Sequence, residues 1–291
     1  MYTTWLDMRR FAAYTYGRGG AAVGEAEVPF DKPGYSCGLA HPGPLGRWDV
    51  RDSVVACVPP LAVSRKMADG ASKPLVENAL AGIVLTAQTF NPSMFTETWL
   101  TQNGLIPADA FVGVRIFSPE VAQFQTADLH VLVIPPKMQI TFGIRGDAGG
   151  ADIPQRIATR TVELLPHTPY QGLGLNFEFF VAQPEGQDFN SYNRVLLGDG
   201  DYRLLREFSV PDAKFGRYFS KKHGDARLKL NITPVRAGPA SKDFLHFSFN
   251  FHHDVTELAP EDRVQKLKQF IAEWSSLRQY AQCLVDLGMT T

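Results

Sequence analysis

The residues best suited to bind a ligand gather in one basic stretch of the C-terminal half. Its cations are accompanied by a single acid, Asp225, and they are Lys214, Arg217, Lys221, Lys222, Arg227, Lys229, Arg236 and Lys242. Three aromatic residues, Phe215, Tyr218 and Phe219, are interleaved with them. Basic side chains neutralise phosphates and exposed aromatic rings stack on bases, so the stretch is a candidate nucleic-acid surface. A solvated pair of basic strands with buried aromatic rings explains the same pattern.

Apolar and polar residues alternate with period two through residues 226–234 and 243–252. This alternation predicts strands with one buried and one open face. Where the apolar residues point to the core, the polar residues between them point outward. Together with the lysines just before them, these outward residues form the predicted binding set: Lys221, Lys222, Arg227, Lys229, Asn231, His246, Asn250 and His252.

The histidines of this set do not predict a metal centre. His246 and His252 are six residues apart on one strand, about 20 Å, which is too far to share an ion. The adjacent pair His252 and His253 points to opposite faces. We therefore expect solvated sheet histidines and no metal.

No motif in the chain predicts catalysis or a cofactor. The run Gly-Asp-Ala-Gly-Gly at residues 146–150 lacks the Gly-Lys-Ser/Thr ending of a phosphate loop and the spacing of a dinucleotide site. None of the seven histidines lies in a recognisable acid–base or nucleophile setting. The prediction is a protein that is not an enzyme.

Composition favours a globular protein of the cytoplasm. The chain has 291 residues, 44% of them hydrophobic and 20% charged, and a net charge of −1, so it has no bulk attraction to nucleic acid or anionic membrane. No apolar run approaches the ~18–20 residues that span a bilayer. Its three cysteines form no C-x-x-C pair, and the N-terminus lacks the apolar core of a signal peptide.

The order of predicted elements repeats, which predicts an internal duplication of β-α-β-β-β-α units. In the first unit we expect strands at 81–87, 110–117, 121–135 and 138–145, with helices at 92–103 and 152–165. In the second we expect strands at 173–181, 215–222, 226–234 and 244–252, with helices at 189–197 and 260–287.

Residue matches between the two units support the repeat. Gly82-Ile83 overlays Gly174-Leu175, and Arg156-Ile157 overlays Arg263-Val264. The element order over residues 75–287 resembles the duplicated saddle of the TATA-binding protein. Two such units joined edge to edge predict an α+β fold with one mainly antiparallel sheet and helices on its apolar face. The resemblance rests on no sequence motif and transfers no functional residue.

We expect units at residues 67–166 and 167–291, the second with a long C-terminal helix. Residues 1–66 are rich in glycine and proline and lack periodicity. They predict a poorly ordered extension or, if Met67 is the native start, a non-native leader.

The function predicted from the sequence is a non-enzymatic cytoplasmic binding or assembly protein that acts through its exposed sheet face or edge. Its expected partner is another protein or a second copy, without a membrane and without a cofactor. The alternative is a nucleic-acid-binding protein that uses the basic strands between Lys214 and Lys242.

Overall fold

The computed structural model describes residues 76–113, 115–143, 152–198, 210–237 and 242–289, without the side chains of residues 77–79 and 237. The statements below concern this part of the chain. The expected extension at residues 1–66 and the glycine-rich run at 146–150 lie outside the described residues.

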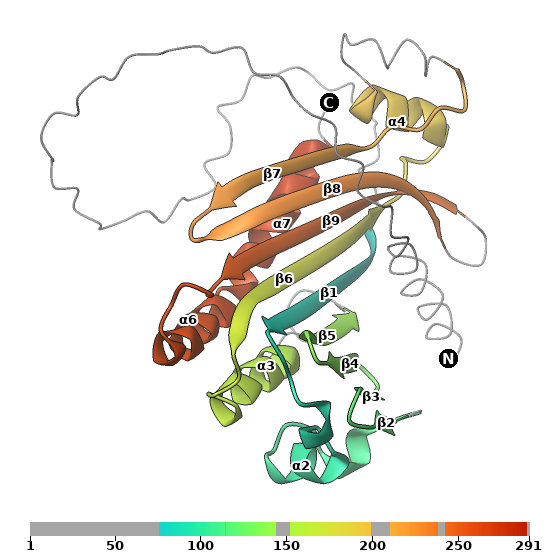
Figure 1. The fold of residues 1–291 in the computed structure, drawn as a ribbon. Coiled ribbons are helices and arrows are strands. Elements are labelled where there is room, and N and C mark those ends of the chain that lie inside the picture. The colour runs from blue at the N-terminus through green and yellow to red at the C-terminus, as the bar shows by residue number, and fades with distance from the viewer. Residues whose placement is uncertain (1–75, 114, 144–151, 199–209, 238–241, 290–291) are drawn as a thin grey trace, which may run out of the picture. The chain divides into compact units, whose positions relative to one another are not determined.

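Nine antiparallel strands form one sheet in the order β2-β3-β4-β5-β1-β6-β9-β8-β7 (Figure 1). The strands are β1 (Val76–Ala87), β2 (Ile116–Phe117), β3 (Ala122–Gln125), β4 (Leu129–Ile134), β5 (Lys137–Gly143), β6 (Tyr170–Val181), β7 (Arg217–His223), β8 (Ala226–Ala237) and β9 (Lys242–Asp254). The predicted α+β class with a mainly antiparallel sheet is confirmed.

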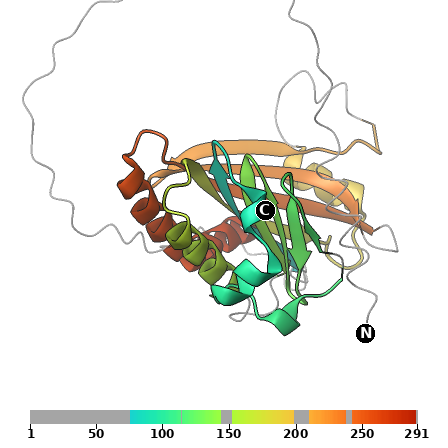
Figure 2. The ribbon, with the colours of Figure 1, turned by 60° about the horizontal axis from the view of Figure 1, so that its bottom comes forward.

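The longer helices cover one face of this sheet, which we call the helix face; the opposite face is the open face. They are α3 (Asp152–Leu164), α4 (Phe189–Leu197), α6 (Pro260–Ala272) and α7 (Trp274–Gly288). Helices α3 and α6 lie side by side, as Figure 2 shows. The short elements η1 (Pro92–Met94), α2 (Glu97–Gln102) and η2 (Ala108–Ala110) connect β1 to β2. No helix in the described ranges is long and apolar enough to cross a membrane.

The core lies between the helix face and the helices. Alternate residues of each central strand supply it, among them Ile83, Leu175 and Phe249, which are fully buried. Trp274 at the start of α7 is 1% exposed, and its ring centroid lies 5.3 Å from that of Phe142 and 4.6 Å from that of Phe177. One indole therefore packs against the β5 strand of the first half and the β6 strand of the second.

The two halves of the sheet share a strand order. From the centre outward, β1 is followed by β5, β4 and β3, and β6 is followed by β9, β8 and β7. Strand β2 is an additional outer strand of the first half. The duplication and the saddle-like topology stay predictions.

Two helices begin directly after a residue whose side chain caps the first turn. The Thr96 hydroxyl accepts a hydrogen bond from the Trp99 amide at the start of α2, and the Asp188 carboxylate does the same for Ser191 in α4. Such side chains satisfy backbone amides that a helix leaves without partners. Helix α4 occupies the predicted residues 189–197.

Two expected strands of the first half are wrong. Residues 121–135 form the hairpin β3–β4 in place of one strand, because the Thr126 hydroxyl accepts from the amides of Asp128 and Leu129 and turns the chain. Of the strand expected at 110–117, only Ile116–Phe117 is formed, and η2 precedes it.

The single closing helix expected at 260–287 is also wrong. The helix is interrupted at Glu273, whose amide donates to the carbonyls of Phe270 and Ile271 in a tightened final turn. Neither proline nor glycine causes the break. Phe270 of α6 and Trp274 and Leu277 of α7 are all buried, as they would be in an uninterrupted helix, and nothing in the structure explains the break.

Candidate binding surface at the β7 edge

Seven of the eight predicted binding residues lie on the open face. Cross-strand register pairs Lys222 with Arg227, Arg227 with His252 and Lys229 with Asn250, and Leu228 and Leu230 point to the core between them. Lys221 is the exception. It pairs with Leu228 and therefore lies on the helix face, as the alternation of a strand requires for the neighbour of Lys222.

A basic strip runs along the open face of β7 and β8, formed by Lys222, Arg227 and Lys229, all exposed. The Arg227 Nε donates to the Ser220 hydroxyl at 2.7 Å, which orients the guanidinium along the strip. Tyr218, 63% exposed, stands opposite Asn231 on the same face. An exposed aromatic ring and three cations thus share one surface at the edge of the sheet.

Lys221 is held on the helix face by α7. Its Nζ donates to the Tyr280 hydroxyl at 2.6 Å and lies 5.3 Å from the centroid of that ring. The His223 ring stacks on the same Tyr280 ring, with a centroid distance of 4.4 Å and an interplanar angle of 18°. Burial, and then the charge of Lys221, lowers the pKa of His223. This cluster fastens β7 to α7.

His246 is not the solvated histidine that the sequence predicted. It is 7% exposed and its ring stacks on Phe180 at 4.6 Å and 11°. The Glu178 carboxylate lies 3.5 Å from its Nε2. Phe180 comes from β6, the strand next to His246, and its presence on the open face could not be read from the alternation of β9 alone.

Asn250 and His252 lie over glycines of β6. The amide of Asn250 donates to Asn176 at 2.6 Å, and a Cβ at Gly174 would lie 3.2 Å from the Asn250 amide nitrogen. A Cβ at Gly172 would lie 2.9 Å from the His252 ring. Burial lowers the pKa of His252. These two residues belong to the tightly fitted middle of the open face and lie directly beside the exposed strip.

The first half presents a different open face. Its outward side chains are mostly uncharged: the Gln123 amide contacts the His130 ring at 3.0 Å, and Gln139 donates to Thr141 at 3.2 Å. On this surface, Lys137 of β5 carries a positive charge, and its ammonium donates a hydrogen bond to Gln139 at 3.1 Å. Arg145 lies outside the described residues.

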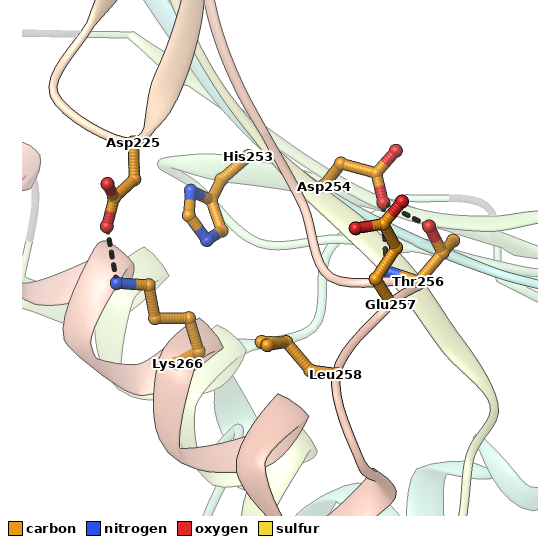
Figure 3. Close-up of a pocket in the computed structure, with 7 residues that line it drawn as sticks. All are labelled: Asp225, His253, Asp254, Thr256, Glu257, Leu258 and Lys266. Carbon is orange, nitrogen blue, oxygen red and sulfur yellow. Dashed lines mark hydrogen bonds and ion pairs between the residues drawn. The ribbon is translucent and has the colours of Figure 1, made fainter. Parts of the chain in front are cut away.

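A separate hollow, which no spacing in the sequence indicates, opens between the β7–β8 turn, the end of β9 and α6 (Figure 3). It consists of two adjoining spaces of about 530 and about 210 Å³ that share Asp225, His253 and Lys266. These three residues are far apart in sequence, and only the packing of α6 beside the turn brings them together. In the described part of the chain, no group of three or more His, Cys, Asp or Glu residues could hold a metal ion.

Charges in the hollow influence one another. The Lys266 Nζ lies 2.6 Å from Asp225 Oδ2 and lowers the pKa of that carboxyl. The Thr256 hydroxyl and amide donate to Asp254 and lower its pKa. Burial raises the pKa of Glu273, and the charge of Asp225 adds to this effect.

Comparison with known proteins supplies no relative. No family model matches the sequence, and no curated protein matches it. Among solved structures, the RNA triphosphatase Pct1 of S. pombe aligns with 74% of this chain and 86% of its own, at 8% identity and a TM-score of 0.13. A likeness of that size carries no argument about fold or activity.

Proposed function

We propose that this chain is a non-enzymatic, cytoplasmic binding or assembly protein that engages a protein partner through edge strand β7, with a second copy of the chain as the simplest partner. The observation that carries the proposal is the exposure of two large aromatic rings on a terminal strand. Tyr218 is 63% and Phe219 is 48% exposed, one on each face of β7. Terminal strands with free ladder groups are ready sites for strand addition.

The sequence of β7 suits pairing with itself. In an antiparallel pair of β7 strands centred on Ser220, Tyr218 stands opposite Lys222 of the other copy, and Phe219 stands opposite Lys221. Each pair places a cation beside an aromatic ring, an arrangement that contributes about 0.5–1 kcal/mol at exposed sites. A twofold arrangement of this kind closes on itself and does not propagate.

The lysines of β7 also determine how the proposed pairing of two β7 strands depends on salt. Two β7 strands bring like charges together, so screening by salt strengthens the pairing. Binding to nucleic acid has the opposite dependence, because salt weakens phosphate contacts.

Sedimentation velocity over a range of protein concentrations tests the pairing. We expect a monomer–dimer equilibrium for the natural chain and a monomer for the double variant Tyr218→Lys, Phe219→Lys. The control is Val195→Lys, which introduces one lysine at a residue 65% exposed on α4 and leaves the dimer intact. A natural chain that stays monomeric at every concentration, or a control that dissociates as fully as the edge variant, overturns the proposal.

The alternative function is binding of single-stranded nucleic acid on the open face of β7 and β8. The observation that favours it is the alignment of Tyr218 with Lys222, Arg227 and Lys229 on one surface. Fluorescence anisotropy with a labelled oligonucleotide tests it. Replacing Lys229 by alanine should reduce the slope of log affinity against log salt by about one, whereas Arg160→Ala on α3 should leave it unchanged.

A further inference from the structure

Tyr280 of α7 contacts two side chains of the terminal strand β7. The Lys221 ammonium donates to its hydroxyl at 2.6 Å and lies 5.3 Å from the centroid of its ring, while the His223 ring stacks on that ring. The Tyr280 ring also packs edge-on against Phe251 of β9, a core residue, at a centroid distance of 6.4 Å. Lys221 itself is an exposed residue. Its ammonium is therefore held in a defined place, while much of its side chain remains accessible to another molecule.

Phe219 is a second residue of β7 on the helix face. Cross-strand register places its side chain on the same side of the sheet as that of Lys221. Helix α7 approaches β7 at Tyr280, and at its last residue, Gly288, it lies over Phe247 of β9. The described helices therefore leave Phe219 48% exposed. An accessible aromatic ring and a lysine held by α7 thus lie next to each other on one side of the edge strand.

The proposed pairing of two β7 strands brings these features of different copies together. In the antiparallel pair centred on Ser220, Phe219 of each copy stands opposite Lys221 of the other, and the Cβ atoms of such pairs are about 4.5–5.5 Å apart. Tyr280 holds the Lys221 ammonium within its own copy before the copies meet. A side chain that is already positioned loses less conformational freedom on binding, so more of the contact energy contributes to affinity.

We infer that Tyr280 of α7 is a positioning residue of this interface, and that Phe219 of the second copy packs against Lys221 on the side away from the Tyr280 ring. Each lysine side chain then lies between two aromatic rings, one from each copy, and the twofold axis produces two such clusters. The inference rests on the proposed β7 pairing, and it adds helix α7 and a specific register to that proposal.

The cations on the helix face of β7 determine the register of the pair. If the strands shift by two residues in one direction, Lys221 stands opposite Arg217 of the other copy. If they shift by two residues in the other direction, Lys221 stands opposite Lys221 of the other copy. Both arrangements set like charges against each other, which destabilises a pair of strands. A foreign strand would need an aromatic residue opposite Lys221 and a cation opposite Phe219, so the clusters also favour a second copy of this chain as the partner.

Sedimentation velocity of Tyr280→Phe tests the positioning role. This variant keeps the ring that stacks on His223 and removes only the hydroxyl that holds the Lys221 ammonium. We expect its dimer to dissociate at about threefold higher protein concentration than that of the natural chain. Tyr192→Phe is the matched control, because it removes a hydroxyl of α4 that donates to Met289 Sδ, and its dimer should match that of the natural chain.

A double-mutant cycle distinguishes a positioning role from a general effect on stability. The measurement is made at about 500 mM salt, at which repulsion between the two edges is screened. Lys221→Met keeps a long apolar side chain but removes the ammonium, and it should weaken the dimer about tenfold, because each dimer has two clusters. In that background Tyr280→Phe should have no further effect, since the hydroxyl acts through the ammonium. A purely structural Tyr280 would weaken both backgrounds equally.

Disulfide trapping tests the register directly. Ser220 stands opposite Ser220 of the second copy, close to the Cβ separation that a disulfide requires. Ser220→Cys should therefore form an intermolecular disulfide with glutathione disulfide as the oxidant, in a chain whose natural cysteines Cys37, Cys57 and Cys283 are replaced by serine. Lys222→Cys in the same background is the control. Its two copies lie about 13 Å apart along the strands, too far for a disulfide.

The outcomes separate this inference from the β7 pairing on which it rests. A natural chain that stays monomeric overturns both. A dimer that Tyr280→Phe leaves unchanged, or weakens equally with and without the Lys221 ammonium, overturns the role of Tyr280 and leaves the edge pairing intact. Equal trapping of Ser220→Cys and Lys222→Cys, or trapping of neither, overturns the register and the two clusters. Circular dichroism of each variant confirms that it is folded.

Discussion

The two halves of the sheet have the same strand order but present different surfaces. In the first half the outer strands are short, and the open face holds uncharged side chains that hydrogen-bond to each other, such as Gln123 with His130. In the second half β7 and β8 are long, charged and exposed, with Tyr218 and Phe219 at the very edge. The same strand order thus supports an open face with hydrogen-bonded side chains in the first half and one with exposed side chains in the second half. The accessible side is where binding is to be sought.

The largest expected effect tests whether the halves are one folding unit. Trp274→Ala removes the indole that contacts Phe142 in the first half and Phe177 in the second. Loss of a buried tryptophan costs about 3–5 kcal/mol of unfolding free energy, and both halves should lose stability together in urea. Tyr218→Ala, at an exposed edge position, should change stability by less than about 0.5 kcal/mol. Separate unfolding transitions in Trp274→Ala would show that the halves are independent.

A smaller effect tests the tight centre of the second half. A Cβ at Gly172 would lie 2.8 Å from the backbone carbonyl of His253, so the strands must separate to accept it. We expect Gly172→Ala to destabilise the chain by about 1–3 kcal/mol in urea unfolding. Gly143→Ala in the first half meets nothing within 4 Å and should be neutral or slightly stabilising. Equal costs at the two positions would contradict the close fit of β6 and β9.

The capping residues should contribute equally in both halves. Thr96→Ala removes the hydroxyl that caps α2, and Asp188→Ala removes the carboxylate that caps α4. Each should cost about 1 kcal/mol by urea unfolding. The exposed residue Asp212 lies outside the helices and makes a matched aspartate control, for which no loss is expected. A loss at one cap alone would mean that only that helix depends on its first turn.

The smallest effect concerns pH. Burial lowers the pKa of three histidines of the second half, His223, His252 and His253, below the value of about 6.5 that they have when unfolded. Between these values the unfolded chain binds more protons than the folded chain, so stability falls as pH decreases from about 6.5. Unfolding measured at pH 7 and pH 5 should show this loss, and His252→Gln should reduce it. Stability that rises on acidification would contradict the burial of these rings.

Local signals in the sequence predicted much of the fold. The alternation of β8 and β9 gave both strands and the outward direction of Arg227, Lys229 and Asn231. Helix α4 formed over the predicted residues 189–197. Where local signals failed at residues 121–135, a turn side chain decided the outcome: Thr126 divides one expected strand into two. The helix break at Glu273 has no counterpart in the sequence pattern, because the apolar stripe continues through it.

The candidate sites were harder to predict because they depend on neighbours that are distant in sequence. Lys221 was grouped with Lys222, although adjacent residues of a strand face opposite ways. The burial of His246 depends on Phe180, a residue of another strand. The hollow joins Asp225, His253 and Lys266, and no spacing within the sequence indicates that these three meet.

The most direct test of the account is the mass of the natural chain in solution as a function of salt, measured by sedimentation velocity. If β7 pairs with β7, the chain forms a dimer whose fraction increases between about 50 and 500 mM salt, as the lysines of the two edges are screened. A chain that remains a monomer across this range, or a dimer that dissociates as salt rises, would contradict the proposed pairing at the edge.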